Sequence, residues 1–552
     1  MNSRYHPNIV SVLLCIGILT VLFAISLMNL TPPISRDALI HHLAIPKLWI
    51  KHGGFYETPW AVYSYNPMNI DLLYLASLYF KNDIAPKFIH FAFGLATGLL
   101  VYLYLKQRLS RNWGLLGGLI YLSTPVVIRL STSAYVDLGL VFFTTASILA
   151  LIRWQDGNYG ELRWLIISAG CMGLAAGSKY NALIPWFFLN LMVAFYYSRD
   201  TKNQLHGVKY ALIFFALTFM IVSPWYIKNH VLTSNPLYPL FDKVFNPARH
   251  AGGQAGGQAG STGIHHLFQR RELMYEESLW ETLLIPIRMF FQGKDNSDQY
   301  FDGVLNPILI VMLPFAFFNK EFARDKVFFL SFSLFFLVIA LFLTVPRVRY
   351  ILPVVPFLAI LAVMGMKGLV DRFKNSRGLT PRIGLIGTFL VAIILVGCNG
   401  LYLKEYFNTI QPIGYILNQE TKDEFLARNL RSYSAMRYVN ENLPANARIF
   451  LIFLAGRGYY LDRAYYHEPS FGMAAINSMV KCARSAPDFK AYIESLGCTH
   501  ILVRNSLFEK YLRDNFQKEV VLRFLGFTRL YWKTIYESNG YTVYEISESF
   551  EA

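Results

Sequence analysis

Residues 9–42 read IVSVLLCIGILTVLFAISLMNLTPPISRDALIHH, and this stretch decides how the rest of the chain is interpreted. It opens with an apolar run that ends near Leu30, continues through two prolines and then reaches Asp37. A run of about 20 apolar residues is long enough to cross a bilayer. Asp37 is therefore expected where water meets hydrocarbon. A charge facing lipid there would be costly, so this carboxylate indicates a functional site.

The composition of the whole chain is typical of a membrane protein. Of its 552 residues, 54% are hydrophobic and only 16% are charged, which is more apolar than a soluble enzyme. Hydropathy predicts eleven spans. This count can change by one or two, because two of the spans run together at Lys179. The predicted spans are 9–30, 87–105, 113–131, 136–153, 164–178, 181–198, 208–225, 303–319, 327–345, 350–366 and 383–402. Residues 67–80 are apolar but too short, and predict an interfacial or re-entrant helix.

The basic residues of the short loops predict the orientation. If the spans alternate, nearly all of these residues fall on one side, which the positive-inside rule makes cytoplasmic. The protein is thus expected in the plasma (inner) membrane with a cytoplasmic N-terminus. The longer segments 31–86 and 226–302, and the tail from 403, then lie outside the cytoplasm. The same bias accounts for the net charge of +16, so nucleic-acid binding is not indicated.

We expect two domains, a transmembrane domain at 1–402 and an extracytoplasmic α/β domain at 403–552. The tail alternates helix-like and strand-like stretches. They are Glu424–Asn442 and Pro487–Leu496 for helices, and Arg448–Leu454, His500–Val503 and Tyr541–Ile546 for strands. A disulfide between Cys482 and Cys498 is permitted there but left open. The AGGQ repeat at 251–258 lacks the Gly-Lys-Ser/Thr of a P-loop and predicts a mobile loop.

Five charged residues are expected together at the outer surface. They are Asp37, Asp137, Lys179, Arg347 and Arg349. Each alone is typical of an interfacial anchor, but five on one face favour a shared site. Asp37 is suited to act as a general base or to help hold a divalent cation (Mg or Mn), with helix capping as the alternative. The three cations suit a phosphate, which at a membrane surface belongs to a lipid. No clear metal-ligand cluster is present.

Several short motifs carry a family resemblance. They are Asp37 with His42-Leu43-Ala44-Ile45-Pro46-Lys47, Tyr65-Asn66-Pro67, Tyr135-Val136-Asp137, Gly177-Ser178-Lys179-Tyr180, Ser223-Pro224-Trp225-Tyr226-Ile227-Lys228-Asn229, Asn235-Pro236-Leu237-Tyr238-Pro239 and Arg349-Tyr350-Ile351-Leu352-Pro353. In this order the chain resembles the polyprenyl-phosphate-sugar-dependent membrane glycosyltransferases of the GT-C fold. That superfamily includes the protein O-mannosyltransferases and the lipid A aminoarabinose transferase, and the family 39-like bacterial branch is the most similar.

The resemblance implies a transferase that moves a sugar from a polyprenyl-phosphate carrier to an acceptor hydroxyl on the outer face. Asp37 takes the place of the catalytic base and Asp137 that of a second aspartate near the acceptor or metal site. Donor phosphate binding is expected at Lys179, Arg347, Arg349 and Tyr350, and substrate contacts at His41, His42, Tyr65, Asn66 and Asn235. The outer segment Asn229–Tyr300 is expected to close over the site.

The chain departs from the mannosyltransferase pattern at one position, because Ala38 stands where a glutamate follows the first aspartate. This departure argues against protein mannosylation. Two other functions remain as alternatives, a lipid-linked glycan ligase or polymerase and a lipid or polysaccharide transporter. The expected transporter features, paired charges at the bilayer midplane and inverted repeats, are not apparent.

Overall fold

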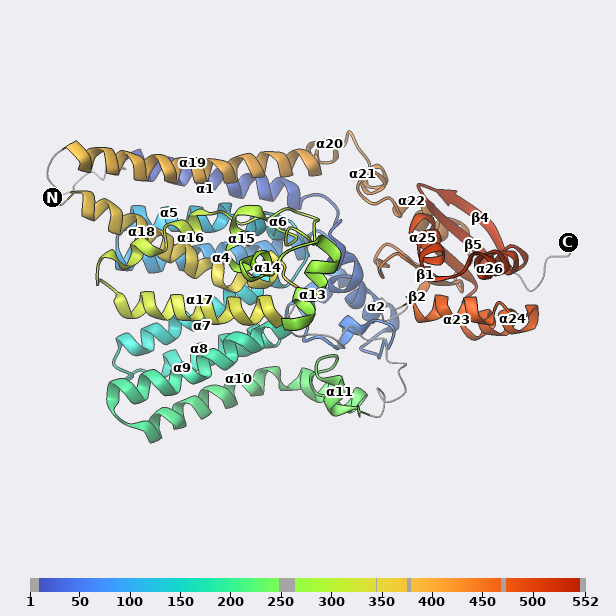
Figure 1. Ribbon diagram of the computed structural model, residues 1–552, viewed down its shortest axis with the longest axis horizontal. Helices are drawn as coiled ribbons and strands as arrows, with labels where there is room; N and C mark the ends of the chain where they lie inside the picture. The colour runs from blue at the N-terminus through green and yellow to red at the C-terminus, as the bar shows by residue number, and fades with distance from the viewer. Residues whose placement is uncertain (1–8, 248–263, 344, 375–378, 468–472, 547–552) are drawn as a thin grey trace.

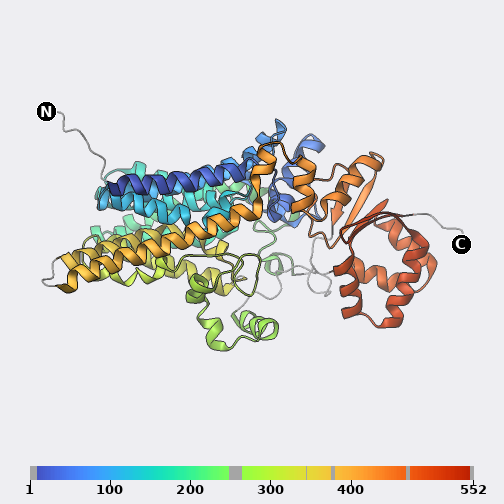
Figure 2. The same cartoon turned by 90° about the horizontal axis from the view of Figure 1, so that it is seen from above.

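The computed structural model describes residues 9–247, 264–343, 345–374, 379–467 and 473–546. A bundle of long helices lies beside a small domain that contains a β-sheet (Figure 1). The view from above shows helix α1 beginning at the end of the bundle remote from the sheet (Figure 2). The AGGQ repeat at 251–258 lies outside the described residues.

The helical part extends to Ile410 and is built from long helices joined by short outer elements. In chain order the helices are α1 (Ile9–Asn29), α2 (Ala44–His52), α3 (Asn69–Tyr79), α4 (Ala85–Arg108), α5 (Arg111–Ser123), α6 (Pro125–Ser131), α7 (Asp137–Asp156), α8 (Leu162–Ala176), α9 (Leu183–Thr201), α10 (Gln204–Thr233), α11 (Asp242–Phe245), α13 (Ile264–Tyr275), α14 (Leu279–Leu283), α15 (Ile285–Gln292), α16 (Ile308–Val311), α17 (Ala323–Leu343), α18 (Val355–Lys374) and α19 (Leu379–Ile410). Tighter or wider single turns are η1 (Ala38–His42), η2 (Val62–Tyr65), η3 (Tyr180–Ala182), η5 (Pro314–Phe318) and η6 (Val348–Val354).

The structure confirms a mostly helical protein with several apolar helices. Among the described helices, α1, α4, α7, α10 and the continuous η6–α18 are long and apolar enough to cross a bilayer, and α5 with α6 makes a sixth if the bent pair is one span. The predicted span 303–319 consists of α16 and the turn η5 rather than one long helix. The count of eleven spans is therefore not confirmed and stays a prediction.

Prolines and burial explain how the bundle is built. Pro125 begins α6, and α5 and α6 meet at an angle of 66°. Proline disfavours helical backbone in the residue before it, and Thr124 is accordingly extended, with ψ of 127°. The helix α18 is central, since 89% of the apolar window of η6–α18 is buried against other helices. Residues 67–80 form the short helix α3, in agreement with the expectation of a helix too short to span.

The C-terminal residues form a five-stranded sheet of order β2-β1-β3-β5-β4. The strands are β1 (Arg448–Ile452), β2 (Ala464–His467), β3 (His500–Arg504), β4 (Trp532–Ser538) and β5 (Tyr541–Ile546). Strand β1 is parallel to β2 and β3, whereas β5 is antiparallel to β3 and β4. The helices are α20 (Pro412–Ile416), α21 (Lys422–Asn429), α22 (Tyr433–Asn442), α23 (Ala474–Cys482), α24 (Ala486–Ser495), α25 (Asn505–Asn515) and α26 (Lys518–Tyr531). We call residues 433–546 the sheet domain.

The alternation of side chains along the central strands gives the sheet domain two cores. Phe450 and Ile501 pack on one face against α23 to α26, and Ile449 and Leu502 pack on the other face with α22. The three predicted strands are present, and β2 and β4 are additional. Cys482 and Cys498 are free thiols in the structure.

The sheet domain rests on the first loop segment, residues 31–86. Lys47 donates from Nζ to the carbonyl oxygen of Tyr459 at 2.7 Å and to the carboxylate of Asp462 at 2.9 Å. A second ion pair joins Lys422 in α21, just before the sheet domain, to Asp83 at 3.0 Å. These contacts fix the segment that carries Asp37 between the bundle and the sheet domain.

Candidate active site

Four segments far apart in the sequence meet at the end of the bundle that faces the sheet domain. Asp37 follows α1 and immediately precedes η1, and Asp137 is the first residue of α7. Lys179 lies between α8 and η3, and Arg349 lies in η6 between α17 and α18. The structure thus brings together four of the five charged residues that the sequence placed on one face. We call Asp37, Asp137, Lys179 and Arg349 the charged cluster.

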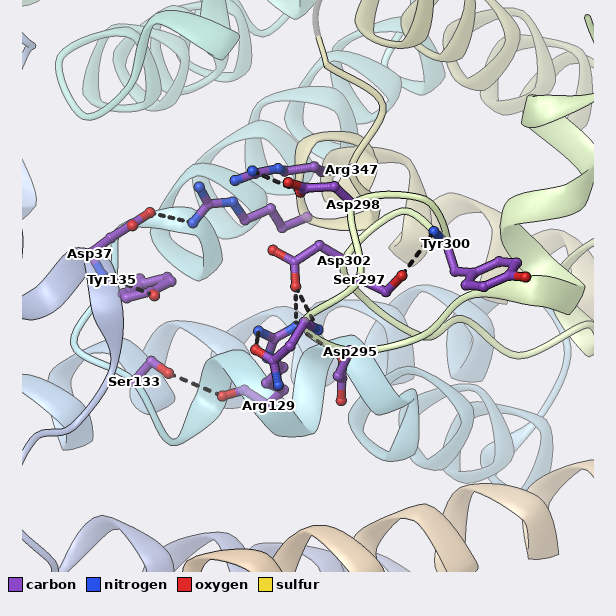
Figure 3. Close-up of polar contacts among 12 residues, drawn as sticks. Asp37, Arg129, Ser133, Tyr135, Asp295, Ser297, Asp298, Tyr300, Asp302 and Arg347 are labelled. Atoms are coloured by element: carbon purple, nitrogen blue, oxygen red, sulfur yellow. Dashed lines mark hydrogen bonds and ion pairs between the residues drawn. The ribbon is translucent and has the colours of Figure 1, made fainter. Parts of the chain in front are cut away.

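The first ion pair of the charged cluster joins Asp37 to Arg349. The backbone N–H of Asp37 also donates to the hydroxyl of Tyr135 at 3.1 Å (Figure 3). Both charged side chains are largely enclosed, at 18% exposure for Asp37 and 15% for Arg349. Burial alone would raise the pKa of Asp37, but the attraction of Arg349 lowers it well below its usual range. Asp37 is therefore ionised and already holds a cation.

The second ion pair joins Lys179 Nζ to Asp137 Oδ1 at 2.6 Å. The carboxylate of Asp137 is almost fully buried, and its Oδ2 has no hydrogen-bond partner. The aromatic ring of Tyr350 connects the two pairs, because Lys179 Nζ lies 5.6 Å and the Arg349 guanidinium 5.2 Å from its centre. Both cations thus lie against one ring, an arrangement that a cation–π interaction stabilises.

His41 and His42 lie beside the charged cluster and differ in their partners. His42 Nδ1 is 2.7 Å from Asp71 Oδ1 in a fully enclosed contact. The ring of His41 stacks on Tyr63 at 4.5 Å, and its Nδ1 is buried without a hydrogen-bond partner. Burial lowers the pKa of each histidine to about 3 and raises the pKa of Asp71 to about 8. At neutral pH both histidines are therefore uncharged.

Asp71 was not among the residues that the sequence singled out. Its signal was nevertheless present, because it is a lone acid in the apolar segment 67–80. An ionisable residue in such a run indicates a buried partner. The partner is His42, which lies 29 positions earlier in the chain and could not be identified by spacing.

Arg347 does not join the charged cluster but contacts a loop. Its guanidinium donates to Asp298 at 2.9 Å (Figure 3). The same loop places Asp295 and Asp302 against Arg129, at 2.9 and 3.0 Å. The backbone of this loop is also bonded to η6, because the Val348 N–H donates to the carbonyl oxygen of Phe301 at 2.8 Å. We call residues 294–303 the acidic loop.

Arg129 is a further residue that the sequence reasoning missed. It is the single basic residue within the predicted span 113–131. In the structure it lies in the short helix α6, beyond the bend at Pro125, where the acidic loop reaches it. The acidic loop thereby clamps α6 and η6 at the edge of the charged cluster.

The remaining predicted substrate contacts form internal bonds of the loops. The hydroxyl of Tyr65 donates to Glu57 at 2.6 Å, and the backbone N–H of Asn66 donates to the carbonyl oxygen of Tyr63 at 3.1 Å. Asn235 is completely buried, and its amide donates to the carbonyl oxygen of Leu240 at 2.9 Å. These bonds shape the loops around the cluster, and a role in substrate binding stays a prediction.

The donor atoms of the cluster do not form a metal site. Within the described ranges, no three His, Cys, Asp or Glu side chains are grouped so that they could hold an ion. Asp37 and Asp137 each face a cation instead of each other. A divalent cation stays a prediction, and no chemical step below depends on one.

The comparisons with known proteins agree with this architecture. A sequence profile described as dolichyl-phosphate-mannose-protein mannosyltransferase matches residues 57–235. No curated protein matches the chain in sequence. The structure of ArnT from Cupriavidus metallidurans in the apo state has 13% identity over 97% of both chains, with a TM-score of 0.55.

Two further solved structures are similar. ArnT from the same organism, bound to undecaprenyl phosphate, has 12% identity over 97% of this chain and 98% of that one, with a TM-score of 0.55. The apo oligosaccharyltransferase of Archaeoglobus fulgidus has 12% identity over 99% of this chain and 75% of that one, with a TM-score of 0.56. At such low identity the likeness concerns the fold alone, and it agrees with the expected GT-C-like fold.

Proposed function

We propose that the protein is a glycosyltransferase that moves a sugar from a polyprenyl-phosphate carrier to an acceptor hydroxyl. The observation that carries the proposal is the charged cluster, in which two carboxylates and two cations share an enclosed site around Tyr350. The GT-C fold supports it. The reaction is proposed on the extracytoplasmic face of the plasma membrane, with the N-terminus in the cytoplasm.

The phosphate of the donor is proposed to bind between Lys179 and Arg349. Two phosphate oxygens can each accept one N–H bond from the guanidinium, and a phosphate oxygen can accept a further one from the ammonium group. Binding would compete with Asp37 for Arg349, since the two anions share one cation. As the attraction of Arg349 is withdrawn, the pKa of Asp37 is expected to rise towards its usual value, which makes this carboxylate a better base. The donor would thus prepare the base.

Asp37 then accepts the proton of the acceptor hydroxyl while the hydroxyl oxygen attacks the anomeric carbon. The bond between that carbon and the phosphate oxygen breaks, and the phosphate takes the electron pair. Lys179 and Arg349 stabilise the negative charge that develops on the phosphate. One displacement from the opposite face inverts the anomeric configuration. Asp137 is proposed to hold Lys179 in place, because the two form a buried ion pair.

A direct test measures release of free polyprenyl phosphate from sugar-loaded polyprenyl phosphates by the full-length protein in membranes. We expect release that depends on an added envelope extract as acceptor, detected by mass spectrometry. Arg349→Lys keeps the positive charge but loses the bidentate hydrogen bonding of the guanidinium group. It should therefore weaken donor binding while retaining some transfer. Transport of intact donor without cleavage would contradict the proposal.

A further inference from the structure

The sheet domain directs the carboxyl end of β1 towards the segment that carries Asp37. The residues after β1 cross to the first loop segment, where the Tyr459 N–H donates to the carbonyl oxygen of Leu39 at 3.2 Å. The Tyr460 hydroxyl donates to the carbonyl oxygen of Pro33 at 2.7 Å. These two bonds lie on either side of Asp37 in the sequence, so the end of β1 lies over this residue's segment.

At the same edge of the sheet the strand order reverses, because β2 and β3 are added on opposite sides of β1. From β1 the chain continues to β2 on one side, whereas β3 lies on the other side of β1 and continues towards β4 and β5. In open sheets with parallel strands, such a switch point leaves a crevice beyond the carboxyl ends of the two strands, and ligands bind in it. Arg457 follows β1, and Arg504 is the last residue of β3.

Three arginines near the carboxyl ends of β1 and β3 have no acidic partner among the described residues. Arg36 comes from the first loop segment, and Arg457 and Arg504 come from the sheet domain. Burial, followed by the positive charge of Arg36, lowers the pKa of Arg457, and Arg504 adds to the effect. Arg36 and Arg504 thus each lie close enough to Arg457 to repel it.

Neutralising contacts are missing for these arginines in the part of the chain that the structure describes. None of the three guanidinium groups makes a hydrogen bond or ion pair there, and Arg457 Nε is buried without a partner. Two other arginines of this half of the chain are satisfied, whereas the exposed Arg431, Arg484, Arg523 and Arg529 also make no such contact among the described residues. Arg428 is paired with Glu420 at 2.9 Å, and Arg463 donates to the carbonyl oxygen of Leu443 at 2.7 Å.

We propose that Arg36, Arg457 and Arg504 bind a phosphate or similar oxyanion carried by the acceptor. We call these residues the arginine site. The inference rests on the proposed function, and it names the class of acceptor: a molecule with a hydroxyl for Asp37 and an oxyanion for the neighbouring guanidinium groups. An oxyanion relieves the repulsion among the arginines and accepts the N–H bonds that they leave unused. The oxyanion belongs either to a lipid headgroup or to a water-soluble acceptor.

The test measures binding of inorganic phosphate to the full-length protein in phosphatidylcholine nanodiscs. The variant is Arg457→Gln with Arg504→Gln, and the matched control is Arg448→Gln. Arg448 is an exposed arginine at the opposite end of β1. Charged hydrogen bonds of this kind predict an affinity about tenfold weaker or more in the double variant. The control should bind phosphate as the wild type does. Because donor-side cations are the same in all proteins, the difference reports the arginine site alone.

A second arm distinguishes the source of the oxyanion. Nanodiscs that contain phosphatidylglycerol should raise the Tm of the wild type more than that of the double variant if a lipid headgroup occupies the site. A free phosphate effect without this difference assigns the site to a soluble acceptor. The Arg457→Lys variant keeps the charge and checks that folding is intact. Equal phosphate affinity in all variants, with no lipid effect, would overturn the inference. Neither arm needs turnover, so a failure of sugar transfer would contradict the proposed function alone.

Discussion

The charged cluster and the arginine site both adjoin the segment that carries Asp37, and they balance their charges differently. In the charged cluster each cation faces one carboxylate, as in the pairs of Lys179 with Asp137 and of Arg349 with Asp37. In the arginine site the guanidinium groups of Arg457 and its neighbours face no carboxylate among the described residues. A ligand of the cluster must therefore break an ion pair, whereas a ligand of the arginine site supplies the missing negative charge.

This difference indicates different tasks. An enclosed cation without a counter-ion is costly, so a site that is shut off from water keeps its cations paired until a substrate arrives. A partly open site can leave its cations unpaired, because water solvates them in the meantime. The paired site is suited to a group whose charge changes during the reaction, and the unpaired site to a group that only needs to be held.

The largest expected effect tests the paired site at its carboxylate. Asp37→Asn removes the proton acceptor but keeps the size of the side chain, so the transfer rate should fall by a factor of about 10²–10⁴. Release of polyprenyl phosphate at saturating donor is the measurement. Asp514→Asn is the matched control, since Asp514 forms an exposed ion pair with Arg513 away from this segment. An undiminished rate in Asp37→Asn would show that Asp37 is not the base.

The second effect tests whether Asp137 depends on its cation. Lys179→Met leaves a buried carboxylate unpaired, which should lower the free energy of unfolding by about 3–5 kcal/mol. In Asp137→Asn with Lys179→Met the charge is gone altogether, so much of that stability should return. Unfolding of the purified full-length protein in detergent compares the two. If the single variant is as stable as the double variant, the pair is not buried as described.

The sequence predicted most of what the charged cluster contains but not how its members pair. Charge at span ends identified Asp37, Asp137, Lys179 and Arg349, because topology alone brings span ends to one surface. Topology does not determine which acid meets which base. That depends on how α7 and the turn η6 pack, because these two elements carry Asp137 and Arg349.

Other features could not be read from the sequence for identifiable reasons. Arg347 differs from Arg349 by two positions, yet the acidic loop holds it away from the cluster through Asp298. The arginine site needs the strand order of the sheet, and the strand β2 that creates the switch point spans only four residues, too short to be recognised. Asp71 and His42 form a pair whose spacing follows no motif.

A third, smaller effect tests a pair in which burial prevails over attraction, in contrast to the charged cluster. In the folded state the pKa of Asp71 is raised from 3.8 to about 8, so the folded protein binds more protons than the unfolded one between these values. Its stability therefore decreases as the pH rises through that window. His41 and His42, with pKa lowered from 6.5 to about 3, act in the opposite direction below pH 6.5.

Between pH 6.5 and 8 the difference between the wild type and Asp71→Asn isolates Asp71, because every other titrating group is the same in both proteins. Across this interval the wild type should lose roughly 2 kcal/mol of unfolding free energy relative to Asp71→Asn. Unfolding of both proteins in detergent at several pH values is the measurement. Parallel curves for the two proteins would mean that Asp71 is ionised beside a protonated His42, and the pair would then resemble the charged cluster.

The smallest effect concerns Arg347, which is paired like the cations of the charged cluster, but with a carboxylate that is exposed to water. Its partner Asp298 is 46% exposed, so the pair is screened by water and is worth less than about 1 kcal/mol. Asp298→Asn frees Arg347 at the edge of the proposed donor site, and polyprenyl phosphate should then bind two- to fivefold more tightly, within about 1 kcal/mol. Asp514→Asn, at an exposed pair with Arg513 in the sheet domain, is the matched control.

Equilibrium binding of polyprenyl phosphate decides between two roles for the acidic loop. Tighter binding in Asp298→Asn alone would make Asp298 a competitor of the donor phosphate, and Arg347 a phosphate ligand that the acidic loop keeps occupied. Unchanged or weaker binding would instead mean that Asp298 only fastens the acidic loop to η6, and that the donor site consists of Lys179 and Arg349 without Arg347.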